Sequence, residues 1–138
     1  MMSTNSLIGV KQSDGSIRAI TCHYDGYCEH VGKILETYYE TEEKANALIN
    51  LGLISCLGPK IRPESEFDES RREAGEPEYV KHSFRTPQKD VTVAYHRDKG
   101  ETLEILKYHS QTGFLRACEW ICYRYLFMDG RWHLFHNL

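Results

Sequence analysis

The chain has 138 residues, of which 41% are hydrophobic, and a formal net charge of -3. This length suits one domain over residues 1–138 that is large enough to bury a core. The weak negative charge excludes the basic stripe typical of proteins that bind duplex nucleic acid. No apolar run approaches the ~20 residues that span a membrane. The first residues, MMSTNSLIGVKQ, lack the pattern of a signal peptide. We expect a soluble, intracellular protein without a membrane partner.

The first predicted elements are two strands within residues 6–24, on either side of the turn dipeptide Asp14-Gly15. A helix is expected soon afterwards, because apolar side chains recur there with a 3.6-residue period. This stripe consists of Tyr27, Val31, Ile34, Leu35 and Tyr38. A second helix is predicted to begin at Thr41, and Gly52 is suited to end it in a left-handed conformation.

The second half of the chain predicts further strands. The run DVTVAYHRDKG alternates between apolar and polar residues, which indicates a strand that continues through His96. A short helix is expected from about Leu103 to Trp120. The C-terminal sequence predicts an aromatic-rich hairpin around Asp129-Gly130, with Trp132 as a core or cross-strand residue. The expected class is α+β, an antiparallel sheet with N-terminal and C-terminal hairpins, packed against two or three helices.

An acidic segment separates the two halves. PESEFDESRREAGEPE, residues 63–78, carries a net charge of -5, so the rest of the chain carries +2. Its proline, serine and glycine content predicts an acidic mobile loop over residues 59–89. A partner-binding arm is the alternative.

The cysteines give no sign of a disulfide framework, since five is an odd number without regular spacing. We expect reduced thiols. Cys118 and Cys122 lie four residues apart, as a pair of metal ligands on a helix can, but no second pair completes a site. The sequence therefore predicts neither a metal nor another cofactor.

Several spaced motifs carry a resemblance that extends from Ile8 to Phe135. They are ITCHYDGYCEHVGKILETYYETEEKANALINLGLISCLG, then VAYHRDKGE, then YLFMDGRWHLF. In this order they resemble a family of small, mostly uncharacterised bacteriophage and prophage proteins, although Cys28 stands where that family is expected to have proline. The resemblance implies an accessory protein that acts on the host from the host cytoplasm.

Two of these motifs predict a binding site. A strand, a glycine and a helix meet at CHYDGY, where backbone N–H groups at the helix start can bind an anion and tyrosines can stack on a ring. The motif YHRDKG adds an imidazole, a guanidinium and an ammonium group. If both motifs share one end of the sheet, they form a pocket for an anionic, ring-bearing molecule such as a nucleotide. The candidate ligand-binding residues are His23, Tyr24, Asp25, Gly26, Tyr27, Tyr95, His96, Arg97 and Lys99.

Structural explanations remain open for the same residues. Tyr27 fits the core stripe of the helix, Asp25 can be a helix cap, and Arg97 with Asp98 can form a surface ion pair. Zinc ligation by Cys22 and His23 is disfavoured, because adjacent strand residues point to opposite faces. The sequence assigns no catalytic residue.

Three functional hypotheses follow. The first is a counter-defence protein that sequesters a small anionic host molecule, such as a nucleotide signal, without turning it over. The second is an inhibitor that contacts a host defence protein directly. The third is a hydrolase that uses His23, His96 and an acid such as Asp25. The many tyrosines and an open sheet edge are also compatible with a homo-oligomer.

Overall fold

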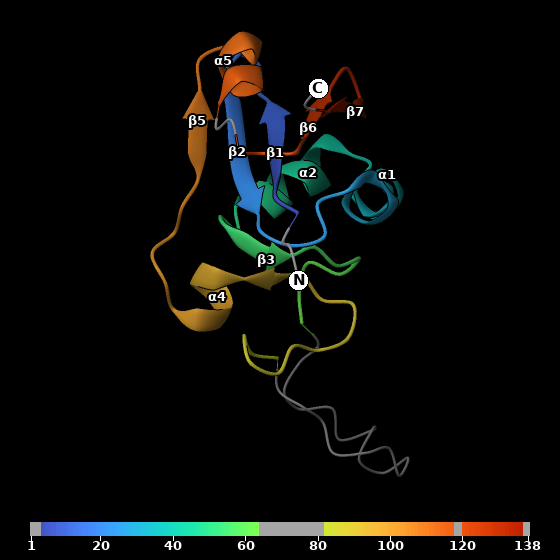
Figure 1. The fold of residues 1–138 in the computed structure, drawn as a ribbon, viewed down its shortest axis with the longest axis vertical. Helices are drawn as coiled ribbons and strands as arrows, with labels where there is room; N and C mark the ends of the chain where they lie inside the picture. The colour runs from blue at the N-terminus through green and yellow to red at the C-terminus, as the bar shows by residue number, and fades with distance from the viewer. Residues whose placement is uncertain (1–3, 64–81, 118–119, 137–138) are drawn as a thin grey trace.

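The computed structural model describes residues 4–63, 82–117 and 120–136. Figure 1 shows an α+β fold in which helices pack around one mixed sheet of seven strands. The elements in chain order are β1 (Ser6–Lys11), β2 (Ile17–Cys22), the π-helical turn η1 (Cys28–Gly32), α1 (Lys33–Tyr38), α2 (Glu42–Ile49), β3 (Ile54–Cys56), β4 (Val93–Ala94), α4 (Tyr95–Lys99), β5 (Leu106–Tyr108), α5 (Gln111–Arg116), β6 (Tyr123–Met128) and β7 (Arg131–His136).

The predicted class and both hairpins are confirmed. β1 pairs antiparallel with β2, and β6 pairs antiparallel with β7. The sheet is mixed rather than wholly antiparallel, because β1 also pairs parallel with β6, and β2 pairs parallel with β3. The strand order is β4-β3-β2-β1-β6-β7, and β5 adds to the edge of β2. The two hairpins, distant in the sequence, therefore meet at the centre of the sheet.

The turns and caps follow the sequence closely. Gly15 has a φ of 88°, and the second hairpin turns through Asp129 and Gly130 with φ values of 55° and 76°. Positive φ at both central residues matches the twist of a two-residue hairpin turn. The Thr41 side chain accepts a hydrogen bond from the Lys44 backbone N–H at the start of α2. These local predictions are confirmed.

The core lies on both faces of the sheet. Ile8 and Val10 of β1 belong to the cluster formed with α1 and α2, whereas Leu7 belongs to the cluster formed with α5. Gly9 makes room for α5, since a Cβ at Gly9 would lie 2.7 Å from a ring carbon of Phe114. Strand alternation thus places neighbouring residues of β1 in separate clusters.

The predicted strand through His96 is wrong beyond Ala94. The chain turns into α4 at Tyr95, and Gly100 ends this helix with a φ of 77°. The Asp98 carboxylate accepts a hydrogen bond of 2.8 Å from the Ala94 backbone N–H. This bond caps the first turn of the helix, as an acidic side chain near a helix start commonly does.

Two helix predictions also need correction. The first helix begins with a π-helical turn, and its stripe is only partly buried, because Tyr27 and Tyr38 are exposed while Val31 and Leu35 are buried. Residues 103–120 contain β5 and the short α5 instead of one helix, and Trp120 is exposed. The 3.6-residue pattern marked the helix but not the width of its buried face.

The predicted loop over residues 59–89 is described only at its ends, and residues 64–81 of the acidic segment lie outside the described residues. The Lys60 backbone N–H donates to Asp90, and the Thr92 backbone N–H donates to Lys60, each at 2.9 Å. Both ends of the insertion therefore pair with each other. Among the described helices, none has the length and apolar character required to cross a membrane.

Candidate functional site

The two predicted motifs meet where β2 ends and α4 begins. His23 Nδ1 and Tyr95 Oη share a hydrogen bond of 2.8 Å, and their ring centroids lie 5.2 Å apart. β3 supports both sides, because the His23 backbone N–H donates to Ile54 and the Tyr95 backbone N–H donates to Leu53. Residues more than seventy positions apart are thereby held in one rigid arrangement.

Aromatic rings continue from this contact in both directions. Tyr24 lies edge-on to His23 with centroids 6.3 Å apart, and Phe84 packs on Tyr95 with centroids 5.0 Å apart. The Lys99 ammonium group lies 4.8 Å from the Phe84 ring centroid, within the range of a cation–π contact. We call the set of His23, Tyr24, Phe84, Tyr95 and Lys99 the aromatic corner.

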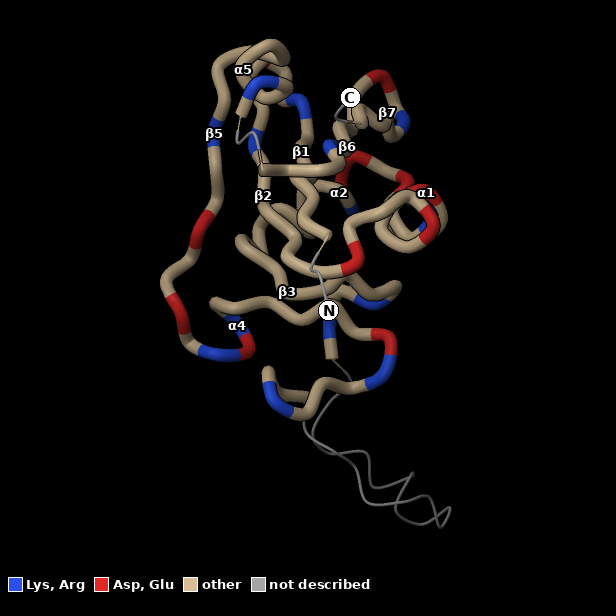
Figure 2. The backbone as a smooth tube through the Cα atoms, in the orientation of Figure 1, with Lys and Arg blue, Asp and Glu red and all other residues tan. Residues whose placement is uncertain are grey.

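The aromatic corner combines two side chains held by a hydrogen bond, His23 and Tyr95, with a more exposed tyrosine ring. Tyr24 is 47% exposed, whereas His23 and Tyr95 are half-buried. Partial burial raises the pKa of Tyr95, so its phenol stays protonated at neutral pH. Figure 2 shows basic positions of α4 close to acidic positions in the segment that follows. Lys99 is accordingly paired with Glu101 at 3.3 Å on the surface.

Arg97 does not project its guanidinium group into the aromatic corner as a ligand donor. It donates to both carboxylate oxygens of Asp98 and to the backbone carbonyls of Thr92 and Ile61. These bonds connect α4 to the chain on both sides of the acidic insertion. Arg97 is therefore a structural clamp, and the Lys99 ammonium group and the His96 imidazole are the side chains left for a ligand near α4.

A buried histidine completes this clamp. His82 Nε2 lies 2.9 Å from the Asp98 carboxylate, and the two side chains are only 2% and 4% exposed. His82 Nδ1 accepts a hydrogen bond from the Gln88 backbone N–H, so the proton of a neutral imidazole is on Nε2 and points at Asp98. This His–Asp pair resembles a catalytic pair, but both of its side chains are almost fully buried.

The remaining predicted residues lie around η1 and the end of α4. The Gly26 backbone N–H donates to Thr4, which removes it as an anion donor, and a Cβ at Gly26 would lie 2.8 Å from Ser6. Asp25 and Tyr27 are exposed, and the Tyr27 hydroxyl lies 3.5 Å from the Asp25 carboxylate. His96 Nδ1 lies 2.7 Å from the carbonyl of Glu101.

The thiols are poorly suited to nucleophilic chemistry. Burial raises the pKa of Cys22 to about 12, and it also raises the pKa of Cys56. A hydrogen bond with Glu29 raises the pKa of Cys28. Because the thiolate is the reactive form, these three thiols stay largely unreactive at neutral pH. Within the described residues, no three His, Cys, Asp or Glu side chains cluster as metal ligands.

Sequence reasoning missed Phe84 and His82. Both lie in the stretch assigned to the acidic loop, where a single aromatic residue and a single histidine give no periodic signal. They become visible only because α4 folds back onto this stretch. No family model, curated protein or solved structure matches the chain. The assignment of the site therefore depends on the sequence motifs and the geometry of this chain.

Proposed function

We propose that the protein binds a small anionic molecule with a flat ring, such as a nucleotide, at the aromatic corner without turning it over. The observation that carries this proposal is the continuous contact from Tyr24 through His23 and Tyr95 to Phe84. This contact presents ring edges and faces from three separate parts of the chain. Hydrogen bonds hold the rings of His23 and Tyr95 in place. Stacking of one base on an aromatic side chain contributes about 1–3 kcal/mol.

The anionic part of the ligand would contact Lys99. Its ion pair with Glu101 joins two exposed side chains, and such pairs contribute less than ~1 kcal/mol. A phosphate group can therefore replace the Glu101 carboxylate at little cost. His96, which is exposed on the same short helix, supplies a second contact through its imidazole ring.

Binding without turnover is favoured by the chemistry of the nearby groups. The His82–Asp98 pair is buried, and the raised pKa values of Cys22 and Cys56 keep these thiols protonated. From the resemblance of its motifs to bacteriophage proteins, we infer that such a binder would act in the host cytoplasm and sequester a host nucleotide signal. Within this proposal the protein acts in counter-defence.

The test is mass spectrometry of small molecules released by heat from protein incubated with lysate of defence-activated bacteria. We expect an intact phosphate-bearing molecule. Calorimetry with that molecule should then show that Tyr24→Ala weakens binding by about 10-fold or more. Tyr38→Ala is the matched control, because Tyr38 on α1 is similarly exposed, at 49% against 47%.

Other outcomes point elsewhere. A chemically altered product would favour the hydrolase hypothesis with His23 and His96. Unchanged affinity in both Tyr24→Ala and Lys99→Gln would remove the aromatic corner as the site. No recovered molecule from several lysates would favour direct contact with a host protein.

A further inference from the structure

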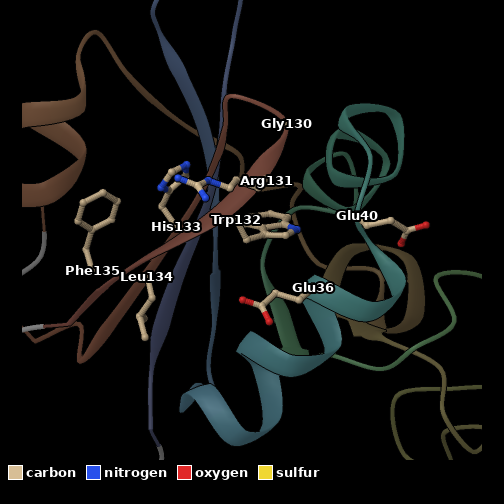
Figure 3. A pocket seen from close by; sticks show the side chains of 8 residues that line it. All are labelled: Glu36, Glu40, Gly130, Arg131, Trp132, His133, Leu134 and Phe135. Carbon is tan, nitrogen blue, oxygen red and sulfur yellow. The ribbon is translucent and has the colours of Figure 1, made fainter.

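A groove among the described residues lies at the β7 end of the sheet, the opposite end from β4. This groove, of about 530 Å³, runs between α1 and the edge strand β7. Its walls consist of Glu36, Glu40 and the six consecutive residues Gly130–Phe135. Figure 3 shows the strand along one side of this groove and α1 along the other. A groove bounded by a strand and a helix has the shape of a site for an extended peptide.

Among the described residues β7 pairs with β6 alone, so its other backbone edge borders this groove. β7 ends the strand order, and its register with β6 runs from Met128↔Arg131 to Tyr123↔His136. Because Met128 and Arg131 flank a two-residue turn, their backbone groups face each other, and the direction then alternates along the strand. The N–H and C=O groups of Trp132 and Leu134 therefore point away from β6, into the groove.

β7 and α1 contribute different kinds of side chain to the groove. Trp132 is held in the core, where its indole N–H donates to the Tyr39 carbonyl at 2.8 Å. Leu134 follows on the same face of β7 and is 46% exposed. Figure 3 shows Glu36 reaching from α1 towards the strand next to Trp132. The groove thus has an apolar part, formed by Trp132 and Leu134, next to the Glu36 carboxylate.

The carboxylates indicate the charge of the partner. Glu40 forms an ion pair with Lys44 at 2.8 Å, whereas Glu36 makes no ion pair within the described part of the chain. The Lys44 hydrogen bond lowers the pKa of Glu40, which keeps this carboxylate ionised at neutral pH. A lysine or arginine of a bound strand would offset the charge of Glu36, which lacks such a partner among the described residues, while a carboxylate placed there would be repelled.

We propose that β7 and α1 bind an extended segment of a partner protein, which adds a strand to the sheet and places a basic side chain against Glu36. A second copy of this chain suits the groove less well. Antiparallel pairing of two β7 strands needs a two-fold axis perpendicular to the sheet, which keeps both α1 helices on one face. Glu36 and Glu40 would then face the same carboxylates of the second copy.

The first experiment uses fluorescence anisotropy with the labelled peptide Val-Lys-Val-Lys-Val-Lys and its counterpart Val-Glu-Val-Glu-Val-Glu. The lysine peptide should bind about 5-fold more tightly, the upper end expected for one exposed charge contact. Glu36→Lys should reverse this preference. Glu104→Lys, which makes the same charge change at an exposed position outside the groove, should leave it unchanged.

The second experiment tests backbone pairing. Leu134→Pro removes an N–H that points away from β6, so the hairpin can still form, since proline is tolerated on edge strands. It should weaken binding by ~10-fold or more, as the loss of a ladder hydrogen bond and its neighbours requires. Two further peptides carry N-methyl groups on the odd or on the even residues. The set whose N–H groups face β7 should lose the same affinity and the other set should lose none, without any change to the protein.

Three results would overturn the proposal. Equal binding of both peptides would remove the charge contact, and equal binding of both N-methylated peptides would remove the added strand. A concentration-dependent dimer that Leu134→Pro dissociates, seen by light scattering, would identify a second copy as the occupant. Tyr24→Ala should not affect peptide binding, because the aromatic corner is a separate surface.

Discussion

At the scale of single residues, Asp98 has more partners than any other described carboxylate. It accepts from the Ala94 backbone N–H, from the Arg97 guanidinium group and from His82, and its side chain is 4% exposed. Ion pairs at the surface contribute little, but removal of one member of a buried pair leaves the other charge without compensation. The clamp around Asp98 should therefore dominate the stability of this end of the molecule.

Asp98→Ala should lower the free energy of unfolding by about 3 kcal/mol, because Arg97 and the Ala94 N–H lose their shared acceptor. Urea denaturation followed by circular dichroism measures this change. The control is Lys44→Ala, which breaks the exposed Glu40–Lys44 pair and should cost less than ~0.5 kcal/mol. Similar losses in both variants would mean that the clamp contributes no more than a surface pair.

The same carboxylate should make stability depend on pH. Burial acts to raise the pKa of Asp98, but hydrogen bonds from Arg97, Ala94 and His82 outweigh it, so the net pKa is lowered. In the unfolded chain the Asp98 carboxyl group has an ordinary pKa of ~3.9. As pH falls, it therefore takes up a proton in the unfolded chain before it does so in the folded protein. The stabilisation is present above about pH 4 and is lost as pH falls through the folded pKa.

Urea unfolding at several pH values between pH 6 and pH 2.5 tests this dependence. Asp98→Asn should flatten the fall in unfolding free energy below about pH 4, because this carboxyl no longer titrates. Asp14 also has a lowered pKa, caused by its hydrogen bonds with Ser16, so Asp14→Asn serves as the comparison. An acid slope that is the same in Asp98→Asn and in the wild-type protein would contradict the prediction.

Residue roles were the least accessible part of the sequence. The pairing of Arg97 with Asp98 was recognisable as an ion pair, yet burial and the third partner, His82, come from a fold-back of the chain. The residues next to an arginine in the sequence do not indicate which distant backbone carbonyl its guanidinium group binds. Tyr24 is exposed, as a ring that stacks on a ligand must be. Tyr27 is exposed as well, although its helical spacing had suggested a core position.

At the scale of elements, local chemistry decided the turns and caps, and they were predicted well. The Asp-Gly dipeptides, the Thr41 cap and Gly52 each satisfy a backbone requirement that involves only neighbouring residues. The strand through His96 was mispredicted because an alternating pattern continues into a helix of only five residues. Such a short helix lacks the length to express its own period.

Two glycines with the same φ allow the cost of backbone strain to be separated from the cost of steric crowding. Gly52 and Gly130 both have a φ of 76°. A Cβ at Gly130 meets nothing within 4 Å, whereas a Cβ at Gly52 would lie 2.7 Å from Leu103 and 3.1 Å from the Glu104 carbonyl. Gly130→Ala should cost about 1 kcal/mol through backbone strain alone, and Gly52→Ala about 2–3 kcal/mol because overpacking adds to it.

Chemical denaturation of the two variants measures this difference. Gly15→Ala provides a further open position with positive φ, and it should resemble Gly130→Ala. Equal costs at positions 52 and 130 would show that the segment around Leu103 moves aside without resistance. That outcome would also question how firmly this segment packs on the end of α2.

At the scale of the whole molecule, the parallel pairing of β1 with β6 connects the first and last hairpins across more than a hundred residues. No sequence pattern predicts this neighbour, because each hairpin satisfies its own alternation with or without it. The pairing buries β1 between β2 and β6, so the molecule should unfold as one unit. A thiol on β2 can report this cooperativity.

Cys22 is fully buried on β2, whereas Cys28 and Cys122 are exposed. In a variant whose other four cysteines are serine, Cys22 should react with 5,5′-dithiobis(2-nitrobenzoic acid) more than ~1000-fold more slowly than in urea, because labelling requires global opening. A variant that keeps only the exposed Cys122 should react rapidly in the folded protein. Asp98→Ala, although outside β2, should accelerate Cys22 labelling by the factor that its loss of stability predicts. Labelling of Cys22 that is fast in the folded protein, or unaffected by Asp98→Ala while urea shows destabilisation, would indicate that the sheet opens locally.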